Sequence, residues 1–144
     1  MLITRLSLFL ALSLSSTLVL AGVPEKLVAC SNTGNTIEIN ECAASLASAE
    51  ESRMRVELAR SKAVLHRVEL FFAKDNRKLK LVAPLQAAQS SWARYREAEC
   101  GFEVELAMGG SVGGLRYQGC LAALNEDRAN RLQTLRAEYE SLGY

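Results

Sequence analysis

Four glutamates close together in the sequence are the residues best placed for acid–base chemistry. They are Glu97, Glu99, Glu103 and Glu105. Glu99 and Glu103 are four residues apart and would share one face of a helix. A hydrolase needs such a pair together with a nucleophile, a base or a metal ligand, and none accompanies them. Neighbouring Arg96 offers an ion-pair partner instead. The pattern therefore predicts a solvated helix surface, and we expect no enzyme activity.

Two further patterns contain residues of the types that bind a cofactor or a metal. The glycine-rich segment 107–119 has no strand before it and no Lys-Ser/Thr after it in phosphate-loop spacing. His66 is the only histidine and is far in sequence from every cysteine, and the chain has no CxxC motif. The sequence thus predicts no cofactor and no metal, with His66 at the surface or at the edge of the core.

The first 21 residues have the pattern of a secretory signal peptide. Arg5 precedes an apolar run over 6–20, and small residues lead to a predicted cleavage after Ala21. A membrane anchor is the alternative, but the run is shorter than the roughly 20 residues that a span requires. We expect an exported protein, most simply periplasmic, with no membrane span in the mature chain.

A second targeting pattern lies slightly further along the chain. Leu27-Val28-Ala29-Cys30 fits the lipobox expression, which would make Cys30 a lipid anchor. Pro24 and two charged residues separate it from the apolar run, whereas a lipobox normally continues directly from that run. Lipoprotein anchoring at Cys30 is therefore kept only as the minor alternative.

The charge of the mature chain excludes some classes of partner. The whole chain carries a formal charge of +1, which falls to zero when Arg5 leaves with the signal peptide. Nucleic-acid binders and polybasic membrane-surface proteins need a cationic excess to bind phosphates. We expect neither, and residues 22–144 are long enough for a single small domain.

The mature chain is predicted to form three helices. The first begins at an N-cap on Thr36 and continues without glycine until the charged residues 74–78, the second follows Pro84 to about Leu106, and the third covers about 115–142. Segment 107–119, with its many glycines, is predicted to be the one clear loop. Short connections favour an all-α, three-helix up-down-up bundle.

The second helix is predicted to be the core helix. Its apolar residues follow helical spacing, which places them together with Glu99 on one inward face. The residues of this face are Leu85, Ala88, Trp92, Tyr95, Phe102 and Leu106. Antiparallel pairing with the third helix sets Trp92 opposite Arg128, which predicts a stacking contact between them. Trp92, Tyr95 and Arg128 are thus expected to be structural.

Four cysteines in a small exported domain are expected to form two disulfides that staple the bundle at one end. Up-down-up packing brings three of the cysteines to the same end, and Cys30 can fold back onto them. Spacing leaves three connectivities open. We favour Cys100–Cys120 across the glycine-rich loop and Cys30–Cys42 across the N-terminal segment, since each of these bonds joins residues that are close in the sequence.

Several stretches together resemble the LprI-like lysozyme inhibitor domain of bacterial exported proteins. They are residues 37–42, ending at Cys42; residues 85–100, with the pattern Gln-x-x-Trp-x-x-Tyr-Arg-x-x-Glu-Cys; Gly109-Gly110-Ser111; and residues 120–124 followed by Arg128. The order of the four cysteines also fits. The first helix lacks the Leu-Asn-x-x-Tyr run expected between residues 49 and 58. The resemblance implies a small, disulfide-bonded helical protein of the cell envelope with lysozyme as its partner.

Inhibition of lysozyme would require a part of the chain to block a cleft with two catalytic carboxylates. A protruding loop with hydroxyl and cationic donors has suitable chemistry, and the candidates are Ser111, Arg116 and Tyr117. The competing hypothesis is a noncatalytic periplasmic interaction or structural module that docks a partner through a helix face.

Overall fold

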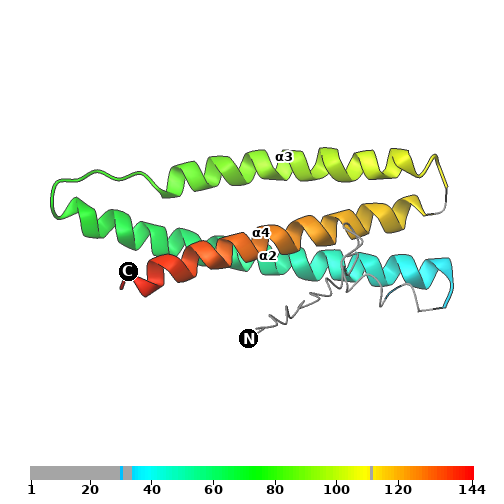
Figure 1. Cartoon of the computed structure of the whole chain (residues 1–144), viewed down its shortest axis with the longest axis horizontal. Coiled ribbons are helices and arrows are strands. Elements are labelled where there is room, and N and C mark those ends of the chain that lie inside the picture. The colour runs from blue at the N-terminus through cyan, green and yellow to red at the C-terminus, as the bar shows by residue number, and fades with distance from the viewer. Residues whose placement is uncertain (1–29, 31–33, 111) are drawn as a thin grey trace, which may run out of the picture.

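The computed structural model describes residues 30, 34–110 and 112–144, so the predicted signal peptide and Ser111 lie outside the described residues. Three long helices make up most of this part: α2 spans Thr36–Ala73, α3 spans Val82–Leu106 and α4 spans Gly113–Ser141. They run up, down and up, with α2 parallel to α4 (Figure 1). The predicted all-α three-helix fold is confirmed. Below, the loop end is the end at residues 107–112, and the connector end is the end at residues 74–81.

Helix α2 begins with a capping box. The Asn35 Oδ1 atom accepts hydrogen bonds from the backbone N–H groups of Ile37 at 2.9 Å and Glu38 at 3.2 Å. Glu38 Oε2 in turn accepts from the Asn35 N–H at 3.3 Å. These bonds satisfy donors that a helix start leaves free. The N-cap is therefore Asn35, and the prediction of Thr36 was wrong by one residue because the amide side chain reaches the first turn.

Helix α3 is capped by a side chain from α2. Glu69 Oε1 accepts hydrogen bonds from the backbone N–H groups of Leu81 at 2.6 Å and Val82 at 3.0 Å. The hydrogen bonds from Val82 and Leu81 hold the pKa of Glu69 below its ordinary value. A carboxylate at this position also interacts favourably with the helix dipole. Glu69 thus joins the end of α2 to the start of α3 at the connector end.

The core lies between α2 and α4 and includes several small side chains. Ser61 is fully buried there and donates a hydrogen bond to the Leu132 carbonyl oxygen at 2.9 Å. Small residues allow two helices to approach closely. The buried apolar residues of the two helices are Ala43, Ala47, Met54, Val64, Leu65, Val68, Ala122, Ala129 and Leu132. These two helices form the tightly packed half of the bundle.

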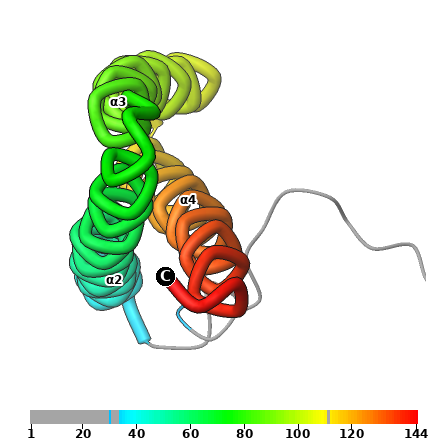
Figure 2. The backbone as a smooth tube through the Cα atoms, turned by 90° about the vertical axis from the view of Figure 1, so that its left-hand side faces the viewer, coloured from blue at the N-terminus to red at the C-terminus, as the bar shows by residue number. Residues whose placement is uncertain are grey.

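Helix α3 packs less closely than the other two. It lies beside α4 near the loop end and diverges from it toward the connector end (Figures 1 and 2). Gln89 and Cys100 are its only buried residues. Most of the surface of α3 is therefore available to solvent.

The first residues of α4 shorten the predicted loop. Gly113, Gly114 and Gly119 lie inside the helix, so the loop ends before Gly113 and does not extend to Gly119 as predicted. Gly113 and Gly119 are buried, and a Cβ on Gly114 would lie 3.2 Å from Asn40 Oδ1 of α2. Close packing of α4 at these positions offsets the helix penalty of about 1 kcal/mol per glycine.

Candidate functional site

Two disulfides fix the loop end of the bundle. Cys100 of α3 is bonded to Cys120 of α4, and Cys30 is bonded to Cys42 of α2. The favoured pairing among the three possible ones is confirmed. The sulfur of Cys30 is used in its disulfide, so in this structure it cannot also carry the thioether-linked lipid of a lipoprotein. Two disulfides are typical of a protein that folds in an oxidising compartment outside the cytoplasm.

Trp92 joins α3 to α4 at mid-length. Two guanidinium groups lie over its ring, with Cζ of Arg96 at 5.3 Å and Cζ of Arg128 at 5.8 Å from the ring centroid. The predicted contact between Trp92 and Arg128 is thus confirmed. Arg128 Nε also donates to Gln89 Oε1 at 2.9 Å, and burial lowers the pKa of Arg128. Trp92 and Arg128 therefore have a structural role.

A polar network around Arg96 crosses all three helices. Arg96 Nη1 donates to Asn125 Oδ1 of α4 at 2.9 Å and lies 3.7 Å from Glu51 Oε1 of α2. Asn125 is 1% exposed and donates to the Ala47 carbonyl oxygen at 3.5 Å. Within the described residues Arg96 Nε is buried without a hydrogen-bond partner, whereas Nη1 and Nη2 are both bonded. A buried polar network that crosses helices favours one alignment of the helices over others. The inward face of α3 is thus largely polar.

The predicted inward face of α3 is wrong in its C-terminal half. Tyr95, Phe102 and Leu106 are 52%, 57% and 45% exposed. Glu99, predicted on the same face, is also exposed. The disulfide holds Cys100 toward α4. At about 100° per residue, Tyr95, Phe102 and Leu106 all project at least about 120° away from Cys100, which turns them to the outer side.

The residues proposed as an inhibitory loop are engaged with α3. Arg116 Nη1 pairs with Glu103 Oε2 at 3.2 Å, and the Tyr117 hydroxyl donates to Glu97 Oε2 at 3.0 Å. Hydrogen bonds from Arg96 and Tyr117 lower the pKa of Glu97, and the same bond to Glu97 raises the pKa of Tyr117. Both side chains are thereby held at the junction of the two helices. Ser111, the third candidate, lies outside the described residues.

The turn after α3 presents a large apolar side chain to solvent. Met108 is 93% exposed and has φ of 50°, followed by Gly109 with φ of 73°. A non-glycine residue in this left-handed region is uncommon, and strain of this sort concentrates at functional sites. Val112, on the other side of the turn, is 49% exposed. The loop end therefore exposes apolar side chains whose exposure the sequence pattern did not predict.

Charge is divided unevenly along the bundle. A plane through Met54, Trp92 and Arg128 cuts all three helices at about the same level, since Gln89 contacts both Met54 and Arg128. The described residues on the loop side, 34–54 and 93–127, include ten acidic and four basic residues, a net charge of −6. Those on the connector side, 55–92 and 128–144, include five acidic and eleven basic residues, a net charge of +6. A near-neutral chain thus folds into a molecule with two oppositely charged ends.

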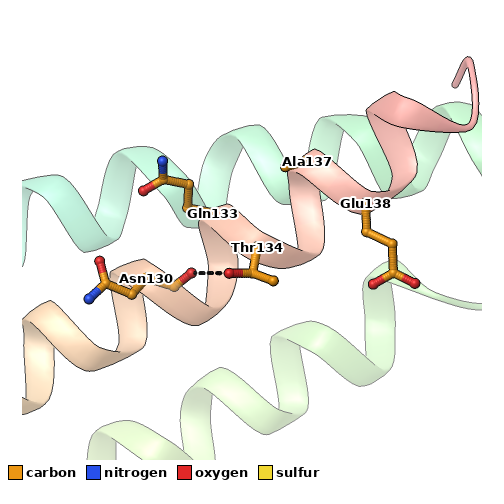
Figure 3. A pocket seen from close by; sticks show the side chains of 5 residues that line it. All are labelled: Asn130, Gln133, Thr134, Ala137 and Glu138. Atoms are coloured by element: carbon orange, nitrogen blue, oxygen red, sulfur yellow. Dashed lines mark hydrogen bonds between the residues drawn. The ribbon is translucent and has the colours of Figure 1, made fainter.

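Two surface depressions offer little for catalysis. One, of about 680 Å³, lies along α4 and is lined by Asn130, Gln133, Thr134, Ala137 and Glu138 (Figure 3). Glu138 is the only carboxylate in its lining, and Thr134 is bonded back to the Asn130 carbonyl oxygen at 3.0 Å. The other, of about 260 Å³, lies at the connector end, where Arg67 donates to the Tyr144 carbonyl oxygen. Neither brings a nucleophile and a base together.

The described residues contain neither a metal-binding cluster nor a membrane-spanning helix. No group of three or more His, Cys, Asp or Glu side chains in residues 30, 34–110 and 112–144 is arranged to hold a metal ion. None of the helices in this part of the chain is both long and apolar enough to cross a bilayer. His66 is exposed and lies 3.5 Å from Glu69.

The model of the family described as lysozyme inhibitor LprI matches residues 29–132. The chain therefore belongs to the LprI family, as its sequence motifs suggested. A search of curated proteins and a search of solved structures found no match. The structure adds that four of the motif residues on α3, Gln89, Trp92, Arg96 and Cys100, face the other two helices. The other two, Tyr95 and Glu99, are exposed.

Proposed function

We propose that this protein binds lysozyme and blocks its activity in the bacterial periplasm, without catalysing a reaction itself. The observation that carries the proposal is the family match over residues 29–132, which covers both disulfides and all of α3. The predicted signal peptide and the two disulfides support an exported location.

The loop end is the part of the molecule best suited to act as a rigid binding element. It is held by two disulfides, and the Arg116 and Tyr117 contacts tie the first turns of α4 to α3. A preorganised surface loses less conformational entropy on binding than a flexible one. In this proposal Arg116 and Tyr117 position the loop end, and Ser111 remains a candidate for direct contact.

The test is an activity assay with the mature protein in large molar excess over lysozyme, read on a soluble oligosaccharide substrate. We expect a dose-dependent loss of turnover and a stable complex in a pull-down experiment. Unchanged turnover together with no complex would refute the proposal. A protein denatured by reduction and alkylation before mixing is the matched control, since it has the same composition without the fold.

A noncatalytic interaction module with another partner is the second candidate. The half-exposed aromatic residues Tyr95 and Phe102 on α3 favour a docking role of some kind. The same pair of assays separates the two functions, because such a module leaves lysozyme turnover and lysozyme binding unaffected.

A further inference from the structure

The outer side of α3 near the loop end presents apolar residues on one face. Tyr95, Phe102 and Leu106 are spaced by seven and four residues, which aligns them along a helix. All three are about half exposed, and Met108 extends beyond the end of the helix with 93% exposure. Aromatic and methionine side chains are enriched at the centres of protein interfaces. A surface of this composition is unusual for a face with no partner.

Carboxylates flank this apolar stripe. Glu99 and Glu105 are exposed on α3 and make no ion pair with any part of the chain that the structure describes. Glu97 and Glu103, by contrast, pair with Arg96 and Arg116. The two uncompensated glutamates belong to the half of the molecule with net charge −6. The stripe therefore lies in a negative field that attracts cationic surfaces and repels anionic ones.

We infer that Tyr95, Glu99, Phe102, Glu105, Leu106 and Met108, together called the acidic outer face, form the contact surface for a lysozyme whose own surface is cationic. The inference rests on the proposed function and adds to it the contact residues and the charge of the preferred partner. Apolar side chains supply the contact energy at the centre of the surface. The glutamates speed association and discriminate between partners by charge.

This contact surface differs from the one expected from the sequence, in which hydroxyl and cationic donors of the glycine-rich loop block the lysozyme cleft. The Arg116 guanidinium and the Tyr117 hydroxyl are bonded to Glu103 and Glu97, so using them on a partner would break bonds within the bundle. The acidic outer face needs no such rearrangement, because its side chains already lie in solvent. Interfaces formed by preorganised surfaces avoid this cost.

The apolar part of the inference is tested by the double variant Phe102→Ser/Met108→Ser. Both side chains are exposed, so the fold should be retained, which circular dichroism verifies. We expect its affinity for a cationic lysozyme to fall by about tenfold or more, as for loss of interface anchors. Leu70→Ser is the matched control, because Leu70 is 54% exposed at the connector end. It should bind lysozyme like the parent.

The charge part is tested by Glu99→Gln/Glu105→Gln, which changes charge with almost no change in shape. We expect association with the cationic lysozyme to slow by about three- to tenfold at low ionic strength, with the difference shrinking at high salt. The same lysozyme with its lysines acetylated should bind the parent more weakly and should not distinguish parent from variant. Lys78→Gln/Lys80→Gln, at the basic end, is the matched control and should bind at least as well as the parent.

The outcomes separate this inference from the proposed function. If the parent binds and inhibits lysozyme but both double variants do so equally well, the acidic outer face is not the contact surface, while the proposed function stands. If the parent is a stable dimer that Phe102→Ser/Met108→Ser converts to a monomer, the face is occupied by a second copy and the inference is wrong. If the parent neither binds nor inhibits lysozyme, the proposed function itself fails.

Discussion

The two ends of the bundle are held together in different ways. At the loop end, disulfides join α3 to α4 and Cys30 to α2. At the connector end, α2 and α3 are joined through Glu69 and the chain itself, and α4 diverges from α3. The loop end is therefore the more constrained part of the molecule, although fewer large apolar residues are buried there.

The ends also differ in what they present to solvent. The loop end exposes a methionine, two aromatic residues and glutamates that have no ion pair within the described part of the chain. The connector end also exposes apolar side chains, Leu70, Phe71 and Leu142, but next to the basic residues Lys74, Arg77, Lys78 and Lys80. Both ends thus expose apolar side chains, but only the loop end combines them with disulfides and an acidic surrounding. This combination suggests that the disulfides hold a binding surface in place as well as stabilising a small core.

The largest loss of stability is expected when the disulfide between α3 and α4 at the loop end is removed. Cys100→Ser/Cys120→Ser is expected to lower the free energy of unfolding by about 3 kcal/mol, from the entropy of the loop that the bond closes. Urea denaturation of parent and variant measures the difference. Inhibition should weaken as well, because α3 loses its main attachment to α4. Unchanged stability would show that the polar contacts alone fix the loop end.

Trp92→Ala should cause the next largest loss of stability, because it removes the contact that joins α3 to α4 at mid-length, between the two ends. The ring packs against the core cluster of Met54, Ala129 and Leu132 and makes cation–π contacts with two arginines. We expect a loss of roughly 2 kcal/mol, less than for a fully buried tryptophan. Thermal and urea denaturation give the value. Tyr95→Ala is the matched control on the same helix and should cost far less, since Tyr95 is 52% exposed.

Glu69→Gln tests the connector end and should have a smaller, pH-dependent effect. The pKa of Glu69 is lowered in the folded state, so its stabilising contribution is present above its unfolded pKa and is lost as the pH falls through the folded pKa. The variant should be less stable than the parent at pH 7, and the difference should vanish in acid. Urea midpoints at the two pH values measure it. Glu138→Gln, in the surface depression along α4, is the control and should be about as stable as the parent at pH 7.

The smallest effect is expected at the exposed charges of the connector end. Lys78→Gln/Lys80→Gln should change the free energy of unfolding by less than about 0.5 kcal/mol, since surface substitutions of this kind rarely do more. Thermal denaturation checks this. A larger loss would mean that the basic connector contributes to the fold, and the contrast between the two ends would need revision.

Local sequence features were enough to determine the helices, their order and the number of disulfides. Long stretches without glycine or proline, rich in good helix formers, set the extent of α2. An even number of cysteines in a small domain indicated two disulfides, and the short connections favoured up-down-up packing. The opposition of Trp92 and Arg128 followed from this topology together with the level of Cys100 and Cys120.

The orientation of α3 was decided only by the tertiary structure. Apolar periodicity placed Tyr95, Phe102 and Leu106 inside, but the helix turns Gln89, Arg96 and Cys100 toward its neighbours. Polar groups can occupy an inward face when partners on other helices satisfy their hydrogen bonds, and the sequence does not show those partners. The division into an acidic and a basic end likewise exists only because the fold brings distant segments of like charge together.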